Sequence, residues 1–189
     1  MTLKHIVDGS QTVLVPRGVG PVVKKLKTKK VIEMTDWETF EFGDAKIHFT
    51  PAHHWGARYI HDVHKGFGGY VIELPDHTVY HSGDSAYFDG FREIGEKHQI
   101  DTALLPIGAY DCPSGREVHM NPEEAVQAFF DLNAAKMIPM HHATFPISNE
   151  HRHEPLQRLH SAIAEHGLTE RVISPHEGEQ VILSSKDKK

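Results

Sequence analysis

The sequence contains a single cysteine, Cys112, which excludes an internal disulfide framework. A lone cysteine fits a reducing compartment, so we expect a cytoplasmic location. No apolar run approaches the roughly 18–20 residues that a bilayer span needs, and no apolar signal-peptide core follows Met1. We therefore expect neither a transmembrane segment nor secretion.

Basic residues are also too few for a nucleic-acid-binding surface. The net charge is −6, and no long stripe of Lys and Arg is interleaved with aromatic residues. Phosphate recognition requires surplus cations, so we expect no nucleic-acid partner. The 189 residues, 39% hydrophobic and 24% charged, have the composition of one globular domain over residues 1–189. Residues 184–189 are polar and are predicted to form a disordered tail.

Histidine, in contrast, is unusually abundant, since 17 of the 189 residues are His. Histidine is the commonest metal ligand in proteins and titrates near neutral pH. Composition alone does not separate a metal centre from surface histidines, so the positions of these residues must decide.

The hydrophobic pattern predicts hairpins first and alternating strands and helices afterwards. A short helix is expected to end at residues 3–7, and residues 16–21 are expected to form a loop. Expected strands cover residues 12–15, 31–34, 37–42, 46–50, 69–74, 78–81, 102–107, 137–140, 171–174 and 180–183. Expected helices cover residues 88–97, a segment that begins at the Asn121 cap, and a stripe that ends at Gly167. This order predicts an α/β fold in which helices cover sheet layers.

Polar residues follow four of the expected strands. His54 follows residues 46–50, Asp84 follows residues 78–81, and His141 follows residues 137–140; Tyr110 and then His119 follow residues 102–107. Ligand sites of layered α/β folds collect beyond strand ends. One carboxylate among several imidazoles suits zinc, manganese or iron.

Each of these residues also has a purely structural interpretation. A single His beside a strand is more often a hydrogen-bonded structural residue than a ligand, and Asp84 could be an ordinary turn residue. A register error would make His53 and His142 the ligands instead of their neighbours. The joint pattern favours a metal site more strongly than any single position does.

Five ordered motifs carry a resemblance to a known family. They are residues 50–55 (TPAHHW), 82–87 (SGDSAY), 106–110 (PIGAY), 119–125 (HMNPEEA) and 140–145 (MHHATF). Together they resemble the metallo-β-lactamase-fold hydrolases, and among these the branch of the N-acyl-phosphatidylethanolamine-hydrolysing phospholipase D and its bacterial relatives. The resemblance implies a metallo-β-lactamase-type αββα sandwich.

The resemblance also implies roles for particular residues. His54 matches a ligand of the first metal, Asp84 the carboxylate that bridges two metals, and His141 a ligand of the second. His119 resembles a histidine that is not a ligand and contacts the substrate's phosphoryl or carbonyl oxygen, and it acts in catalysis together with Asp84. Residues implied to line the substrate pocket are Trp55, Arg58, Tyr87 and Tyr110.

One hallmark of that family is missing from this sequence. The family's H-x-H-x-D-H motif should lie upstream of residues 3–7, and no such motif is present. The segment 61–64 (HDVH) resembles part of it but follows His54, and we interpret it as a loop. We therefore expect an N-terminally truncated fold that contains only its C-terminal portion. Two zinc ions are expected in the complete fold, and one or none held tightly here, with Mn²⁺ or Fe²⁺ as alternatives.

The leading hypothesis is a zinc-dependent hydrolase of phosphodiester, phospholipid-type or related ester substrates, impaired in this chain. The alternative is a non-catalytic fragment or binding module derived from the same fold, and a zinc-storage protein is the weakest hypothesis. Absent opening strands would leave a sheet edge uncovered, which predicts a homo-oligomer. A small-molecule or lipid substrate is the expected partner, although a fold does not fix its substrate.

Overall fold

The computed structural model describes residues 3–55, 64–113 and 117–183. The expected tail at 184–189, most of the segment 61–64 and the expected pocket residue Arg58 lie outside these ranges. The strands are β1 (Thr12–Pro16), β2 (Lys30–Met34), β3 (Thr39–Phe42), β4 (Ala45–Thr50), β5 (Gly69–Glu73), β6 (Thr78–His81), β7 (Thr102–Pro106) and β8 (Lys136–Met140). The helices are α1 (Leu3–Ile6), α2 (Gly20–Val23), α3 (Gly90–Lys97), α4 (Pro122–Asp131) and α5 (Glu154–His166).

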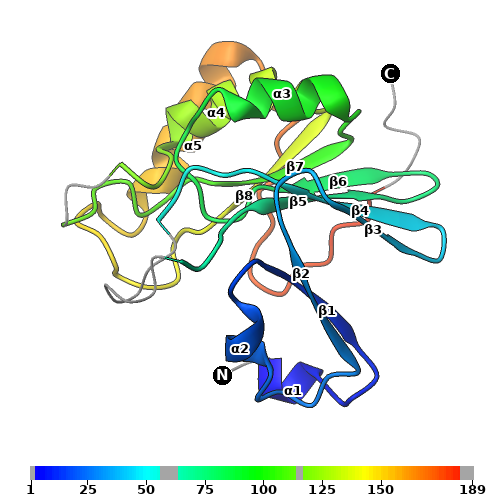
Figure 1. Cartoon of the computed structure of the whole chain (residues 1–189). Coiled ribbons are helices and arrows are strands. Elements are labelled where there is room, and N and C mark those ends of the chain that lie inside the picture. Colours follow the sequence, from blue (N-terminus) through cyan, green and yellow to red (C-terminus); the bar gives the residue numbers. More distant parts are fainter. Residues whose placement is uncertain (1–2, 56–63, 114–116, 184–189) are drawn as a thin grey trace.

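The strands form one large and one small sheet. The large sheet has the order β3-β4-β5-β6-β7-β8, and the small sheet is the parallel pair β1-β2. Helices α3, α4 and α5 cover one face of the large sheet, and the small sheet with α1 and α2 lies on the other side (Figure 1). This arrangement confirms the expected α/β fold in which helices cover sheet layers.

The direction of the strands determines where the loops meet. β6, β7 and β8 run parallel, whereas β4, β5 and β6 are joined antiparallel. β4 therefore points the same way as β6, β7 and β8, and the carboxyl ends of all four strands lie at one edge of the sheet. This edge is where the sequence places its polar residues.

The main core lies between the large sheet and its three helices. Side chains there are fully buried on both layers, including Phe91, Ile94, Leu105, Phe129, Met137 and Leu159. At about 25 cal/mol per Å² of apolar surface, each of these large side chains contributes roughly 1.5–3 kcal/mol to folding. The core thus fixes the strands whose ends carry the site.

Helix α4 begins as its sequence predicts. The Asn121 side chain accepts a hydrogen bond from the Glu124 amide at 2.9 Å, and the Glu124 carboxylate accepts one from the Asn121 amide at 2.9 Å. This reciprocal capping box satisfies two amides that the helix cannot satisfy itself. It also fixes the chain immediately after His119.

Two sequence-based expectations about the elements are wrong. The strands expected at 171–174 and 180–183 do not form in the described residues, where only Val172 makes an isolated bridge to Met137 of β8. A strand needs a partner along its length, but Pro175 and a turn at Gly178 follow, and Ile182 remains 83% exposed. In addition, the loop expected at 16–21 is shorter than predicted, because Gly20 and Pro21 begin α2.

Candidate metal centre

Asp84 lies at the centre of a histidine cluster at the edge described above. Its Oδ2 atom is 3.2 Å from His141 Nε2, 3.3 Å from His119 Nε2 and 3.4 Å from His54 Nε2. The four residues predicted from the motifs therefore converge on one carboxylate oxygen. The alternatives left open by the sequence point elsewhere: the His53 ring stacks edge-on against Phe88, with centroids 6.5 Å apart.

Glycine at position 83 allows the turn that presents Asp84. Gly83 has a φ of 69°, and a Cβ atom at this position would lie 2.4 Å from the Gly68 carbonyl oxygen. Any other residue would combine a left-handed backbone with a backbone collision. The turn is thus specific to glycine, and it directs Asp84 beyond the end of β6.

Ser85 ties together three of the loops that form the centre. The fully buried Ser85 hydroxyl accepts a hydrogen bond from the His53 amide at 2.9 Å. The Ser85 carbonyl accepts one from the Met120 amide at 3.2 Å, and the Ala86 amide donates to the His53 carbonyl at 2.7 Å. The backbones that carry His54, Asp84 and His119 are therefore held to one another independently of any ligand.

The charges in the centre reinforce each other. Burial raises the pKa of Asp84, but the three imidazoles lower it by more and hold it well below its usual range. The Asp84 carboxylate in turn raises the pKa of His141. Asp84 is therefore an anion at neutral pH, as a metal ligand must be.

The donor atoms fit a divalent metal. His54 Nδ1 lies 2.9 Å from the Trp55 carbonyl, to which it donates, so its Nε2 presents a lone pair. His54 Nε2 and Asp84 Oδ1 are buried and have no hydrogen-bond partner. Zinc–ligand bonds of about 2.0–2.2 Å place tetrahedral ligands about 3.3 Å apart. Each separation between Asp84 Oδ2 and a histidine matches this spacing, so each imidazole pairs with Asp84 at a distance that suits zinc.

His119 differs from His54 in how it meets the carboxylate. Its Nε2 lies in hydrogen-bonding geometry with Asp84 Oδ2, and a carboxylate can only accept, so this nitrogen carries a proton. However, the donor atoms of His54, Asp84 and His119 all lie within 4.8 Å of one another. Distance therefore permits His119 as a ligand, whereas its hydrogen bond favours a role toward substrate.

A cavity of about 490 Å³ opens beside the cluster. Trp55 lines it as the resemblance implies, and Cys112, Val118 and Ile147 line it without having been predicted. These three follow β7 and β8 at loop positions outside the five motifs, so only the folded chain identifies them.

Tyr87 and Tyr110 do not line this cavity in the described part of the chain, contrary to expectation. The Tyr87 hydroxyl donates to Asp131 at 2.5 Å, and the Tyr110 hydroxyl donates to Glu154 at 2.8 Å. Both rings are used to attach helices α4 and α5 to the loops, and Arg158 stacks on Tyr110 at 4.8 Å.

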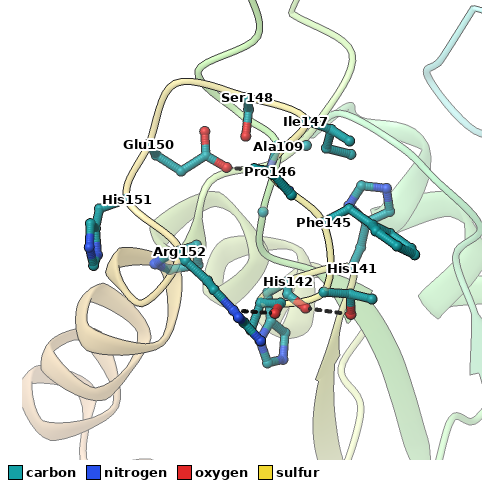
Figure 2. A pocket seen from close by; sticks show the side chains of 14 residues that line it. Ala109, His141, His142, Phe145, Pro146, Ile147, Ser148, Glu150, His151 and Arg152 are labelled. Carbon is teal, nitrogen blue, oxygen red and sulfur yellow. Dashed lines mark hydrogen bonds between the residues drawn. The ribbon is translucent and has the colours of Figure 1, made fainter.

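A second cavity of about 400 Å³ adjoins the first, with His141 and Ile147 lining both. It is bounded by the loop between β8 and α5, from which Arg152 reaches back and donates to the Ala143 carbonyl at 2.7 Å (Figure 2). His142 lines this cavity, and burial lowers its pKa. The residue next to His141 thus belongs to the neighbouring cavity rather than to the contacts of Asp84.

A helix-covered sheet with an imidazole–carboxylate cluster at its strand ends defines the class of metallo-β-lactamase-fold proteins. The chain belongs to the family described as the beta-lactamase superfamily domain, whose model matches residues 1–142.

Individual relatives agree with this assignment. Uncharacterized protein Rv0906 of Mycobacterium tuberculosis is 31% identical over 169 residues, which are 86% of this chain and 45% of that protein. A UPF0173 metal-dependent hydrolase of Bacillus cereus is 36% identical over 126 residues, which are 64% of this chain and 51% of the relative. The chain therefore spans about half the length of the curated relatives it matches.

Solved structures share the fold. Igni18, a metallo hydrolase from the archaeon Ignicoccus hospitalis, superimposes with a TM-score of 0.62 at 25% identity, covering 92% of this chain and 79% of Igni18. YhfI of Bacillus subtilis, a metallo-β-lactamase fold protein, superimposes with a TM-score of 0.61 at 18% identity. The match covers 90% of this chain and 65% of YhfI. At that identity, YhfI supports the fold alone.

Proposed function

We propose that this chain carries the metal centre of a metal-dependent hydrolase. The observation that carries the proposal is the convergence of three imidazole nitrogens on one Asp84 oxygen at 3.2–3.4 Å, beside an open cavity. Relatives named metal-dependent hydrolases support it. The ligands proposed are His54, Asp84 and His141, and the metal proposed is zinc.

When bound, a divalent metal supplies Lewis-acid chemistry, because it acidifies water and polarises the bond to be cleaved. Side chains of the protein supply the other groups that the reaction needs. His119 holds a proton on Nε2 at the wall of the cavity, where it can stabilise negative charge on a substrate oxygen or protonate the leaving group. Val118 and Ile147 give the cavity an apolar wall beside the proposed ligands.

The proposed substrates are phosphodiesters, phospholipids and related esters. Arg152 lines the adjoining cavity and would attract an anionic group, while Phe145 and Ile147 there, 76% and 56% exposed, would contact an acyl chain. A phospholipid combines both chemistries in one molecule. The two cavities meet at His141, so a substrate with a charged head and an apolar tail could occupy both.

A substrate panel tests this proposal. We expect zinc-dependent hydrolysis of bis(p-nitrophenyl) phosphate or an N-acyl phosphatidylethanolamine in vesicles, and loss of it in Asp84→Asn. Hydrolysis of p-nitrophenyl acetate alone would restrict the substrates to carboxylic esters. Stoichiometric zinc binding with no turnover of any substrate would overturn the hydrolase and favour the alternative, a non-catalytic binding module with the same fold.

We also propose a homo-oligomer in the cytoplasm. β3 is an edge strand of the large sheet and exposes Phe42 by 67%, which favours pairing with a second copy of the chain. None of the helices described here is long and apolar enough to cross a membrane. Light scattering of the wild type and of Phe42→Lys tests the oligomer, which should dissociate in the variant.

A further inference from the structure

A second group of metal-ligating side chains lies on the large sheet outside the Asp84 centre. His48 on β4, Glu73 at the end of β5 and His98 immediately after α3 lie together. His48 Nε2 is 3.3 Å from Glu73 Oε2, and His98 Nδ1 is 2.9 Å from Glu73 Oε1. One donor atom from each residue lies within 4.8 Å of the other two.

This group is separate from the Asp84 centre because it lies at the other end of the strands. β4 pairs with β5 so that Thr50 faces Gly69 and Lys46 faces Glu73. Thr50 leads to His54, whereas Glu73 leads into the turn before β6. Four residues of strand, about 13 Å at 3.3 Å per residue, separate Gly69 from Glu73. No residue is shared between the two groups.

The sheet register places two of the three side chains on one face. His48 is directly opposite Val71, and Glu73 lies two residues further along β5, so both point to the side of the sheet that α3 covers. The last turn of α3 then delivers His98, whose amide donates to the Ile94 carbonyl at 3.0 Å. Three separate elements thus supply one ligand each.

The hydrogen bonds of His48 leave one of its nitrogens free to bind a metal. Its Nδ1 lies 2.8 Å from the Thr39 hydroxyl oxygen. Its Nε2 is buried and has no hydrogen-bond partner, although a Glu73 oxygen is 3.3 Å away. When Nδ1 donates to the Thr39 hydroxyl, the lone pair of the imidazole lies on Nε2, the nitrogen that faces Glu73. Fixing one imidazole nitrogen by hydrogen bonding is how proteins prepare the other as a ligand.

The spacing and burial of the group also suit a metal. The 3.3 Å between His48 Nε2 and Glu73 Oε2 matches the distance of about 3.3 Å between ligands of tetrahedral zinc. The imidazoles of His48 and His98 are only 15% and 10% exposed, whereas the Glu73 side chain is 35% exposed. The side of the group formed by the two imidazoles is therefore closed to solvent, and the side formed by Glu73 is open to water as a fourth ligand.

We propose that His48, Glu73 and His98 form a second zinc site that links β4, β5 and the end of α3. Binding through His98 Nδ1 moves the proton of this neutral imidazole from Nδ1 to Nε2, and the three side chains and one water complete the tetrahedron. Other residues line the two cavities beside Asp84, which assigns this group a stabilising role rather than a catalytic one.

The test isolates this site by removing the other one. In an Asp84→Asn background, we expect one zinc per chain after dialysis, measured by plasma mass spectrometry. Adding Glu73→Gln should reduce it to none. His77→Gln is the matched control, because His77 lies at the same end of the sheet but bonds Thr102 at 3.0 Å, and it should retain one zinc. Zinc at 100 times its dissociation constant should raise Tm by roughly 5–10 °C in the background and the control only.

Two results would overturn the site. The first is an Asp84→Asn protein that binds no zinc, and the second is a Glu73→Gln addition that leaves the zinc count unchanged. Circular dichroism of each metal-free protein checks folding. His98→Gln, which alters only the end of a helix, gives the same comparison if Glu73→Gln disturbs the sheet.

Discussion

The large sheet carries a carboxylate–histidine group at each end, and the two groups are built differently. The Asp84 group lies on loops beyond the strand ends and borders a cavity of about 490 Å³. The Glu73 group uses residues within or next to the strands and a helix end. Loops can converge around a substrate, whereas strands hold side chains against each other. Under the two proposals, similar ligands therefore serve a reaction at one end and stability at the other.

The strongest way to break this comparison is to remove each carboxylate in turn. We expect Asp84→Asn to reduce hydrolysis about 10³-fold or more, because loss of a single charge-stabilising group already costs about 10²–10³-fold. Glu73→Gln should leave kcat/KM within about twofold, since no atom of its group borders the cavity. Steady-state kinetics with zinc in excess measures both. An equal loss in the two variants would mean that the two ends act as one site.

His119→Ala sharpens the comparison inside the Asp84 centre. We expect kcat to fall about 10²–10³-fold while the zinc content stays unchanged. The reason is that His119 Nε2 donates a hydrogen bond to Asp84 and therefore offers no lone pair to the metal. The measurement is zinc per chain beside kcat. His53→Ala is the control, since its ring contacts Phe88 and should leave both values near wild type. If His119→Ala loses its zinc, His119 is a ligand.

Gly83→Ala tests whether the loops depend on the backbone. The variant combines a left-handed residue with a Cβ 2.4 Å from the Gly68 carbonyl oxygen, and should lose about 3 kcal/mol or more of unfolding free energy. Gly43→Ala has a φ of 58° and nothing within 4 Å, so it should lose only about 1 kcal/mol. Urea denaturation measures both. Equal losses would show that the Gly83 turn relaxes freely.

Tyr70 lies on β5 between the two groups, and Tyr70→Phe should have the smallest effect of these variants. Its hydroxyl is buried without a hydrogen-bond partner, so removing it should change stability at pH 7 by about 1 kcal/mol or less. Burial raises the pKa of Tyr70 to about 12. The folded state thus holds this proton more tightly than the unfolded state, and its contribution is complete below pH about 10 and lost as the pH rises toward 12. The variant should lose less stability than wild type over that range, as measured by urea denaturation at pH 9 and 11.

The sequence predicts most of the fold because its local signals agree with the tertiary contacts. Asn121 and Glu124 form the expected capping box, and Gly167 ends α5 with a φ of 65°. The prediction fails after α5, where apolar residues up to Ile182 suggest strands but β8 offers a partner only at Val172. Local pattern cannot show whether a neighbouring strand is available.

The two carboxylate groups differ in the same respect. Asp84 and its histidines lie in short motifs after strands, so their convergence could be predicted. His48, Glu73 and His98 are each 25 residues apart and belong to no motif. The pairing of His48 with Val71, two residues before Glu73, and the end of helix α3 bring them together. The abundance of histidine was the single hint, and it gave no positions.

The hydrogen bonds around Ser85 have a consequence for local unfolding. The amides of His53, Ala86 and Met120 are bonded within one network centred on a fully buried side chain. None of these loops can open without breaking bonds to another, so the three amides should exchange with deuterium at a common rate, as one cooperative unit. His54, Asp84 and His119 then leave their places together or not at all, because the backbones that carry them belong to this one unit.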